Sequence, residues 1–310
     1  MCSRNLLGSF PPPLQSGDEV NVVASSSAVD NSEHIMRGVS ILESWGLRIR
    51  PDVISRRRWG YLAGRDDERR NDLQSPSGAN LLACARGGWG AARLLEEPVA
   101  WQPGWLLGFS DVTSLLCARM AAGVGGGVHG PLLTTLADEP EWSQSRLRDL
   151  LFGCTLPDLK GVSWQGGLAV GPLLAVNLTV ASHLIGSRFL PDLHGVVLVI
   201  EDVGEAPYRI DRMLTQWRLA GMLQSLAGLG FGRFVDCNNE PESDGFSLDE
   251  VLLERTADLG IPVVGNLLVG HGPGGNAALP VGAMATLDGD QGVLRVGSKS
   301  GVLTEPQQPQ

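Results

Sequence analysis

Residues 105–116 read Trp-Leu-Leu-Gly-Phe-Ser-Asp-Val-Thr-Ser-Leu-Leu, an apolar run that leads through a polar turn into a second apolar segment. The first run predicts a buried strand, and the apolar spacing after Asp111 predicts a helix. Ser110 therefore stands on a strand-to-helix turn. In a nucleophile elbow, such a turn exposes a serine hydroxyl, and the free N–H groups at the helix start favour a developing oxyanion.

Two observations favour a simpler interpretation of this stretch. A serine at the start of a helix often serves only as a cap for the backbone N–H groups. The usual elbow also has glycine two residues after the serine, whereas this chain has Val112. The elbow hypothesis therefore needs support from other parts of the chain.

The first half of the chain alternates between predicted strands and helices. A strand is expected at residues 19–24, a helix at 35–45 and an extended segment at 47–53. Another strand, 80–85, runs into the turn 86–90, Arg-Gly-Gly-Trp-Gly, whose glycines allow backbone N–H groups to face a ligand. This alternation is typical of a parallel sheet covered by helices.

An irregular region with prolines and tryptophans, residues 138–167, predicts a domain boundary. We expect an N-terminal α/β domain at 1–150, a linker at 151–168 and a C-terminal domain at 169–310. The first of these domains carries Ser110.

Three other segments give local expectations. Residues 128–131, Val-His-Gly-Pro, predict a turn. Residues 195–201 form the clearest strand of the chain, and it ends in the carboxylates of Glu201 and Asp202. Residues 283–297 predict a hairpin near the end of the chain.

Composition narrows the classes of function. Lysine and arginine number 24 against 34 aspartates and glutamates, so the net charge of −10 disfavours a broad surface for nucleic acid or an anionic membrane. No run approaches the roughly 20 apolar residues of a membrane span, and no signal-peptide core is visible, so a cytoplasmic location is expected. The five scattered cysteines contain no C-x-x-C pair and are expected to be reduced thiols.

Ser110, Glu201 and His271 each stand at or just beyond the end of a predicted strand. His271 lies in the glycine-rich loop 270–275, where it fits either a catalytic base or an ordinary surface histidine. A nucleophile, a base and an orienting carboxylate are what acyl transfer needs, because the imidazole takes the serine proton and the carboxylate stabilises the imidazolium. The three residues together predict a serine hydrolase.

Several motifs of the chain occur together, in one order, between residues 16 and 290. They are Ser-Gly-Asp-Glu-Val at 16–20, Gly-Tyr-Leu-Ala-Gly at 60–64, Arg-Gly-Gly-Trp-Gly at 86–90, Gly-Phe-Ser-Asp-Val-Thr at 108–113, His-Gly-Pro at 129–131, Glu-Asp-Val-Gly-Glu at 201–205 and Gly-His-Gly at 270–272. In these motifs and their order the chain resembles the LD-carboxypeptidases. These serine peptidases include murein tetrapeptide carboxypeptidases and microcin-immunity proteins.

The resemblance implies an α/β fold, with an N-terminal flavodoxin-like domain built on a parallel sheet. It implies a C-terminal domain with helices around a β-sheet or small barrel, and a site in the cleft between the two. It also implies a homodimer.

The resemblance further implies roles for five residues. Ser110 would be the nucleophile, His271 the general base and Glu201 the orienting carboxylate, with the backbone N–H groups of Asp111 and Gly88 as the oxyanion hole. The implied reaction is hydrolysis of the amide that joins an L-centre to the terminal D-amino acid of a murein tetrapeptide. It passes through an acyl-enzyme and needs no metal or other cofactor.

The chain departs from the family pattern at two places. Ala175-Val176 stands where the family commonly has two glycines, and their side chains are expected to narrow the cleft or to alter backbone contacts. Trp89 stands where tyrosine or phenylalanine is common, which is expected to keep an aromatic wall.

Two other functions remain open at this level. The chain could be a related peptidase or amidase that acts on microcin-like peptide-nucleotides or on other acylated small molecules. It could also be a non-catalytic module that holds an anion between Gly87-Gly88 and the start of the Ser110 helix.

Overall fold

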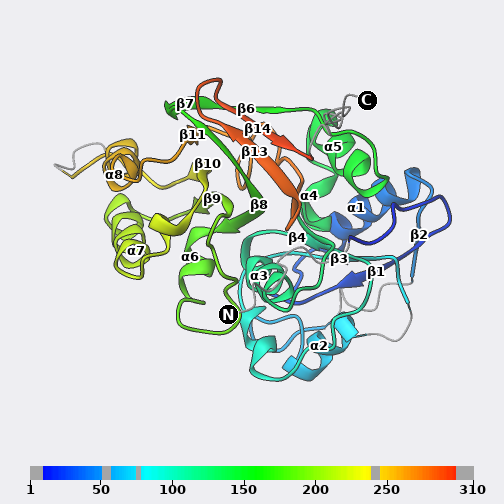
Figure 1. Ribbon diagram of the computed structural model, residues 1–310. Helices are drawn as coiled ribbons and strands as arrows, with labels where there is room; N and C mark the ends of the chain where they lie inside the picture. Colours follow the sequence, from blue (N-terminus) through cyan, green and yellow to red (C-terminus); the bar gives the residue numbers. More distant parts are fainter. Residues whose placement is uncertain (1–9, 51–56, 75–77, 239–244, 298–310) are drawn as a thin grey trace, which may run out of the picture.

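The computed structural model describes residues 10–50, 57–74, 78–238 and 245–297. Its strands form two sheets, and the chain builds them largely one after the other (Figure 1).

The first sheet has six strands in the order β12-β5-β4-β3-β1-β2. Five of them are parallel, and their order β2-β1-β3-β4-β5 is that of a flavodoxin-like sheet, as predicted. The sixth strand, β12, comes from near the end of the chain and pairs antiparallel with β5. The strands are β1 (Glu19–Val23), β2 (Arg48–Ile49), β3 (Leu81–Cys84), β4 (Trp105–Gly108), β5 (Gly127–His129) and β12 (Leu279–Val281).

Helices cover both faces of this sheet because its strands are apolar on both sides. Along β3, Leu81 and Ala83 pack into the core on one face, and Leu82 and Cys84 pack into the core on the other. Helices α1, α4 and α5 supply residues to the first core, and α2, η2 and α3 to the second. These helices are α1 (Ser32–Ser44), α2 (Asp66–Gln74), η2 (Ala92–Glu96), α3 (Thr113–Ala121), α4 (Leu133–Leu136) and α5 (Glu141–Leu151).

The second sheet has eight strands in the order β6-β14-β13-β8-β9-β10-β11-β7. Its two edge strands are separated in the chain only by Gly161, so the sheet curls into a nearly closed barrel. Strands β8 to β11 are parallel neighbours, and β13 and β14 form the predicted antiparallel hairpin. The strands are β6 (Leu159–Lys160), β7 (Val162–Gln165), β8 (Leu168–Asn177), β9 (Val197–Val203), β10 (Gly228–Val235), β11 (Val263–Gly265), β13 (Met284–Asp288) and β14 (Val293–Val296).

The two halves share one continuous hydrophobic core. Leu115 of α3 in the first half packs in the same cluster as Val176 of β8 and Trp217 of α7 in the second. Figure 1 shows α3 and α6 where the halves meet, with α7 and α8 on the outer side of the barrel. The remaining helices are α6 (Leu178–Ser182), α7 (Pro207–Leu219), η4 (Leu223–Ser225) and α8 (Leu248–Thr256).

Three segments differ from the sequence prediction. The turn predicted at 128–131 was wrong, because its first residues form β5 and only the Gly130-Pro131 that follows leaves the sheet. Strands β6 and β7 lie inside the segment predicted as a linker; they are short and partly exposed, so they lack a clear apolar pattern. Of the extended segment 47–53, only β2 is a strand, and residues 51–53 lie outside the described residues.

No helix in the described part of the chain is long and apolar enough to cross a membrane. The cysteines found there are free thiols, namely Cys84, Cys117, Cys154 and Cys237, and Cys2 lies outside the described residues.

The shared core predicts that Trp217 is a major determinant of stability. Its side chain is 0% exposed, and its indole N–H donates to Ser182 Oγ at 2.8 Å. We expect Trp217→Ala to lower the free energy of unfolding by about 3–5 kcal/mol, measured by urea denaturation. Leu219→Ala on the same helix is the control, because Leu219 is 85% exposed and should change stability by about 0.5 kcal/mol or less. Equal effects of the two substitutions would contradict this view of the core.

Candidate active site

Ser110 occupies a strained turn between β4 and α3. The strand ends at Gly108, Phe109 is extended with φ −151°, and Ser110 has φ +61°, a left-handed conformation that residues other than glycine rarely adopt. The short 3-10 helix η3 (Ser110–Val112) then leads directly into α3. The backbone thus turns sharply at Ser110, as expected for a nucleophile elbow.

The absence of the usual second glycine is explained by local packing. Val112 has φ −65° and ψ −16°, an ordinary helical conformation that needs no glycine. Its side chain packs against Gly108, where an added Cβ would lie 2.8 Å from Val112 Cγ1. In this elbow the Val112 side chain lies so close to the backbone of residue 108 that glycine is required there.

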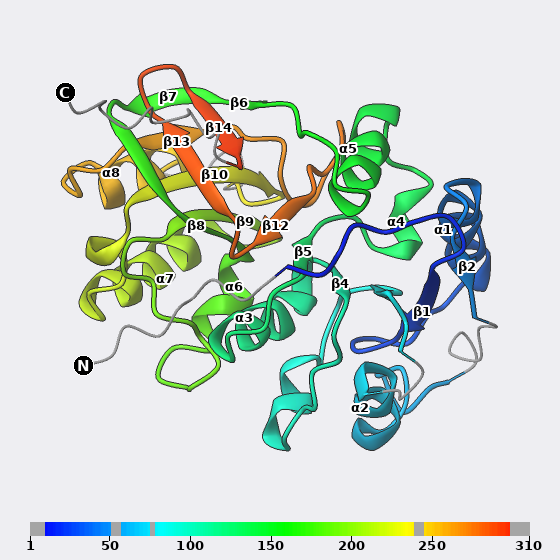
Figure 2. The ribbon, with the colours of Figure 1, turned by 45° about the vertical axis from the view of Figure 1, so that its right-hand side comes forward.

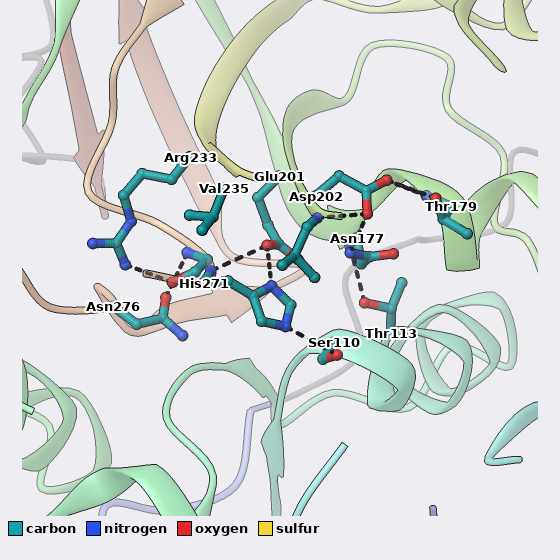
Figure 3. A network of polar contacts seen from close by, with 12 residues as sticks. Ser110, Thr113, Asn177, Thr179, Glu201, Asp202, Arg233, Val235, His271 and Asn276 are labelled. Carbon is teal, nitrogen blue, oxygen red and sulfur yellow. Dashed lines mark hydrogen bonds and ion pairs between the residues drawn. The ribbon is translucent and has the colours of Figure 1, made fainter. Parts of the chain in front are cut away.

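Ser110, His271 and Glu201 come together although they are far apart in the sequence (Figure 3). His271 Nε2 lies 3.2 Å from Ser110 Oγ, and His271 Nδ1 lies 2.7 Å from Glu201 Oε2. The backbone N–H of His271 also donates to Glu201 Oε2, at 3.2 Å. A carboxylate at Nδ1 favours the tautomer with its proton there, which leaves Nε2 free to accept the serine proton.

Glu201 is fully buried near the end of β9. Its second oxygen, Oε1, has no hydrogen-bond partner in the described part of the chain. The hydrogen bonds to this carboxylate therefore come from the backbone N–H and the ring of His271. A buried negative charge in this position stabilises a positive charge on the imidazole.

The loop that carries His271 is fixed from several directions. Gly270 has φ +96°, and an added Cβ there would lie 2.5 Å from Glu201 Cγ, so only glycine fits against the carboxylate. Its N–H donates to Asn276 Oδ1 at 2.8 Å, and its carbonyl accepts from Arg233 Nη2 at 2.6 Å. The ring of Phe109, the residue before the serine, lies 4.8 Å from the His271 ring between centroids.

The glycine turn after β3 faces the serine. An added Cβ at Gly87 would lie 3.0 Å from Ser110 Oγ and 3.6 Å from the backbone nitrogen of Asp111. The N–H groups of Gly88 and Asp111 donate to no acceptor in the described ranges. The space beside Ser110 therefore has two available backbone donors, which is what a negatively charged oxygen needs.

Side chains hold this turn in place. Ser27 Oγ accepts from the N–H of Trp89 at 3.0 Å, and Asp111 Oδ2 accepts from the N–H of Ala91 at 2.8 Å. The buried guanidinium of Arg69 donates to the carbonyl oxygen of Gly90 at 2.9 Å. Burial raises the pKa of the Asp111 carboxyl, against hydrogen bonds that lower it.

Asp202 and Glu205 make contacts away from the serine. Asp202 accepts hydrogen bonds from Asn177 Nδ2 at 3.0 Å and from the N–H and hydroxyl of Thr179, each at 2.8 Å. Thr113 in the elbow helix accepts from the N–H of Asn177 at 3.0 Å, which ties the elbow to the end of β8. Glu205 pairs with Arg209 at 3.2 Å. These contacts of Thr113 and Asn177 were not predicted from the sequence, although Thr113 ends the Gly-Phe-Ser-Asp-Val-Thr motif.

His129 is a second histidine near the site. It is fully buried at the end of β5, its ring centroid lies 5.7 Å from that of Phe109, and neither ring nitrogen has a hydrogen-bond partner in the part of the chain described. Burial lowers the pKa of His129 to about 4, so the residue is neutral at pH 7. Its motif position was visible in the sequence, but its burial was not.

A cavity of about 450 Å³ opens at Ser110 and His271. Its walls include Arg86, Gly88, Phe109 and Thr134. The expectation that Ala175-Val176 narrows this cleft was wrong. Ala175 is buried inside the barrel and Val176 in the shared core, because successive residues of a strand point to opposite faces.

Trp89 does not line the cavity either, and it is 70% exposed on the surface. Within the described residues, no three His, Cys, Asp or Glu side chains gather where they could hold a metal ion.

Comparison with known proteins gives the family. Residues 20–130 match the model of the LD-carboxypeptidase N-terminal domain, and residues 170–287 match that of the LD-carboxypeptidase C-terminal domain. The chain belongs to the LD-carboxypeptidase family. A candidate carboxypeptidase of Synechocystis sp. is 49% identical over 291 residues, 92% of this chain and 96% of that protein. The murein tetrapeptide carboxypeptidase of Pseudomonas aeruginosa is 33% identical over 258 residues, 76% of this chain and 81% of that enzyme.

Solved structures of LD-carboxypeptidase relatives share the fold. The muramoyltetrapeptide carboxypeptidase of Oxalobacter formigenes superimposes with a TM-score of 0.81 at 25% identity, over 90% of this chain and 99% of that one. The microcin C7 self immunity protein MccF gives a TM-score of 0.81 at 20% identity, over 95% of this chain and 99% of that one.

The positive φ of Ser110 predicts an unusual order of stabilities. Ser110→Gly should be more stable than Ser110→Ala by about 1 kcal/mol, because glycine adopts the left-handed conformation without a steric cost. Ser114 in α3 is the matched control: there the alanine variant should be more stable than the glycine variant by about the same amount. Urea denaturation of the four variants measures both differences. The same order at both positions would show that the turn at Ser110 is unstrained.

Proposed function

We propose that this protein is a serine carboxypeptidase that hydrolyses the amide bond between an L-centre and the C-terminal D-amino acid of murein tetrapeptides. The observation that carries the proposal is the chain of contacts from Ser110 through His271 to the buried Glu201. Each of the three groups has the chemistry that its place in an acyl-transfer reaction requires.

In the first step, Ser110 Oγ attacks the carbonyl carbon of the last amide bond while His271 Nε2 takes the hydroxyl proton. Glu201 stabilises the resulting imidazolium through Nδ1 and keeps the ring in position. The imidazolium then gives its proton to the amine of the departing D-amino acid, which leaves the shortened peptide as an ester on Ser110.

In the second step, a water molecule attacks this ester while His271 Nε2 takes its proton. The ester bond to Ser110 then breaks, the imidazolium returns the proton to Ser110 Oγ, and the shortened peptide leaves with a free carboxylate. The tetrahedral intermediate of each step carries a negative oxygen. The N–H groups of Asp111 and Gly88, which lack acceptors in the described residues, would bind that oxygen beside the serine.

The choice of substrate rests on the relatives. Two proteins similar over most of the chain bear the names of murein tetrapeptide and muramoyltetrapeptide carboxypeptidases. In the proposed arrangement residues 1–150 supply the nucleophile, residues 169–310 supply Glu201 and His271, and 151–168 connect them. The homodimer and the cytoplasmic location stay predictions from sequence.

Mass spectrometry tests the function directly. After incubation with a muropeptide that ends in D-alanine through an LD-bond, we expect the substrate to lose one alanine. An all-L peptide of the same composition should stay intact, because the preference is for a D-configured leaving residue. Ser110→Ala should abolish turnover, and Glu201→Gln and His271→Ala should each reduce it by orders of magnitude.

A folded Ser110→Ala protein that keeps full activity would rule out the assigned nucleophile. No cleavage of the LD-peptide by the unmodified protein would rule out the murein substrate. In that case a peptide-nucleotide or another amide would be the next substrate to test.

The geometry of the glycine turn gives a second prediction. Gly87→Ala should lower turnover by about 100-fold or more, because the added methyl group enters the space between Ser110 Oγ and the Asp111 N–H. Gly60→Ala is the control. A Cβ there meets nothing within 4 Å and Gly60 lies outside the cavity, so its φ of +59° should cost about 1 kcal/mol of stability but leave turnover unchanged. Initial rates on the LD-peptide measure the effect, and circular dichroism checks folding. A folded, fully active Gly87→Ala variant would place the oxyanion elsewhere.

A further inference from the structure

Arg86 has hydrogen-bond donors that the protein does not use. Its side chain lines the cavity that holds Ser110 and His271. Nη1 donates to the carbonyl oxygen of Ala28 at 2.8 Å and to Asp30 Oδ2 at 3.2 Å. Within the described ranges, Nε and Nη2 donate to no acceptor. Since the side chain is 33% exposed, the N–H groups of these two nitrogens are available to a molecule in the cavity.

The charge on Arg86 is only partly compensated. Asp30 is 74% exposed and shared with Arg58, whose Nη2 lies 2.6 Å from Asp30 Oδ1. The hydrogen bond from Arg58 is the main cause that lowers the pKa of Asp30, so this carboxylate is ionised at neutral pH. One carboxylate between two guanidinium groups leaves a net positive charge. Arg86 is also the only arginine or lysine among the described residues that line the cavity.

Arg86 lies close enough to the proposed cleavage site to contact the carboxylate of a C-terminal residue. In the last residue of a peptide, only the amide bond and two backbone bonds separate the scissile carbonyl carbon from the terminal carboxylate carbon. The two carbons are therefore at most about 4 Å apart. A group that recognises the terminal carboxylate must lie next to the place where the scissile carbonyl oxygen binds.

Arg86 meets this condition because it lies beside Gly88, whose N–H we assign to the oxyanion site. A Cβ added at Gly88 would be 3.9 Å from Arg86 Nη2, and Arg86, Gly88 and Ser110 line the same cavity. Two neighbouring N–H groups of a guanidinium match the two oxygens of a carboxylate.

We propose that Arg86 binds the free C-terminal carboxylate of the substrate through Nε and Nη2. This contact restricts cleavage to the last peptide bond, because an internal bond has no carboxylate at that distance. The inference rests on the proposed function, since it assumes that a peptide is cleaved at Ser110. It adds a substrate-binding residue outside the Ser110, His271 and Glu201 group.

The test compares two forms of one substrate, a muropeptide that ends in D-alanine and the same peptide with its C-terminus as a carboxamide. The unmodified protein should cleave the acid about 10- to 100-fold more efficiently than the amide, measured as kcat/KM. Arg86→Gln should lose about the same factor on the acid and change little on the amide, so that the ratio of the two approaches one. Arg86→Lys, which keeps the charge but not the fork of donors, should give an intermediate ratio.

Arg37→Gln is the matched control. Arg37 is also an ion-paired arginine, but its partner is Asp138 and neither residue lines the cavity or contacts Arg86, so the acid-to-amide ratio should stay that of the unmodified protein. Activity on the amide also reports whether each variant is folded.

Two results would overturn the role of Arg86 while leaving the proposed function intact. One is an unmodified protein that cleaves acid and amide equally well. The other is an unchanged acid-to-amide ratio in both Arg86 variants. In that case Arg86 would only stabilise the local structure through its hydrogen bond to the Ala28 carbonyl oxygen. Cleavage of neither peptide by the unmodified protein would overturn the proposed function and this inference with it.

Discussion

The pairing of β12 with β5 is the contact on which the site depends. In its register, Leu279 lies opposite His129 and Val281 opposite Gly127. The strand belongs to the second half of the sequence but completes the sheet of the first, and it begins eight residues after His271. Figure 2 shows β12 where the two sheets meet, beside β5. Because a strand in a ladder cannot shift without losing its hydrogen bonds, this pairing anchors the end of the His271 loop to the sheet that carries Ser110.

Side chains from the first half reinforce this connection. Ser143 Oγ donates to the carbonyl oxygen of Asn276 at 2.8 Å, and Arg146 Nε donates to that of Ala278 at 3.0 Å. Helix α5 thus holds the segment between the histidine loop and β12. Together with the core shared by α3, β8 and α7, these bonds make the two halves one packed unit around the cavity.

The site also combines a strained element with rigid supports. Ser110 has a left-handed backbone conformation, which is strained for a serine. Gly87 leaves space beside the Ser110 hydroxyl, because any other residue there would place its Cβ 3.0 Å from Ser110 Oγ. Ser27, Arg69 and Asp111 fix the glycine turn opposite through bonds to Trp89, Gly90 and Ala91. In the proposed reaction, a Gly88 N–H held in a fixed turn would need no reorganisation to bind the negative oxygen.

Local patterns in the sequence predicted much of this protein. The alternation of apolar segments indicated a parallel sheet with helices, the hairpin near the end of the chain was correct, and the motifs indicated the family. The predictions were weakest where an element is short or depends on distant partners. Strand β5 has only three residues and is followed directly by Gly130-Pro131, so its local sequence predicts a turn, and β6 and β7 are too exposed to show an apolar period.

By itself, the sequence determined which residues carry reactive groups and that Ser110 stands on a strand-to-helix turn, because periodicity and turn residues act over a few neighbours. Only the tertiary structure decided that Ser110 and His271, 161 positions apart, lie within 3.2 Å. It also decided that Ala175 and Val176 are buried in cores, and that Arg86 Nε and Nη2, near Gly88, meet no acceptor among the residues that the structure describes. These outcomes depend on strand register and on packing between distant segments, which no local pattern encodes.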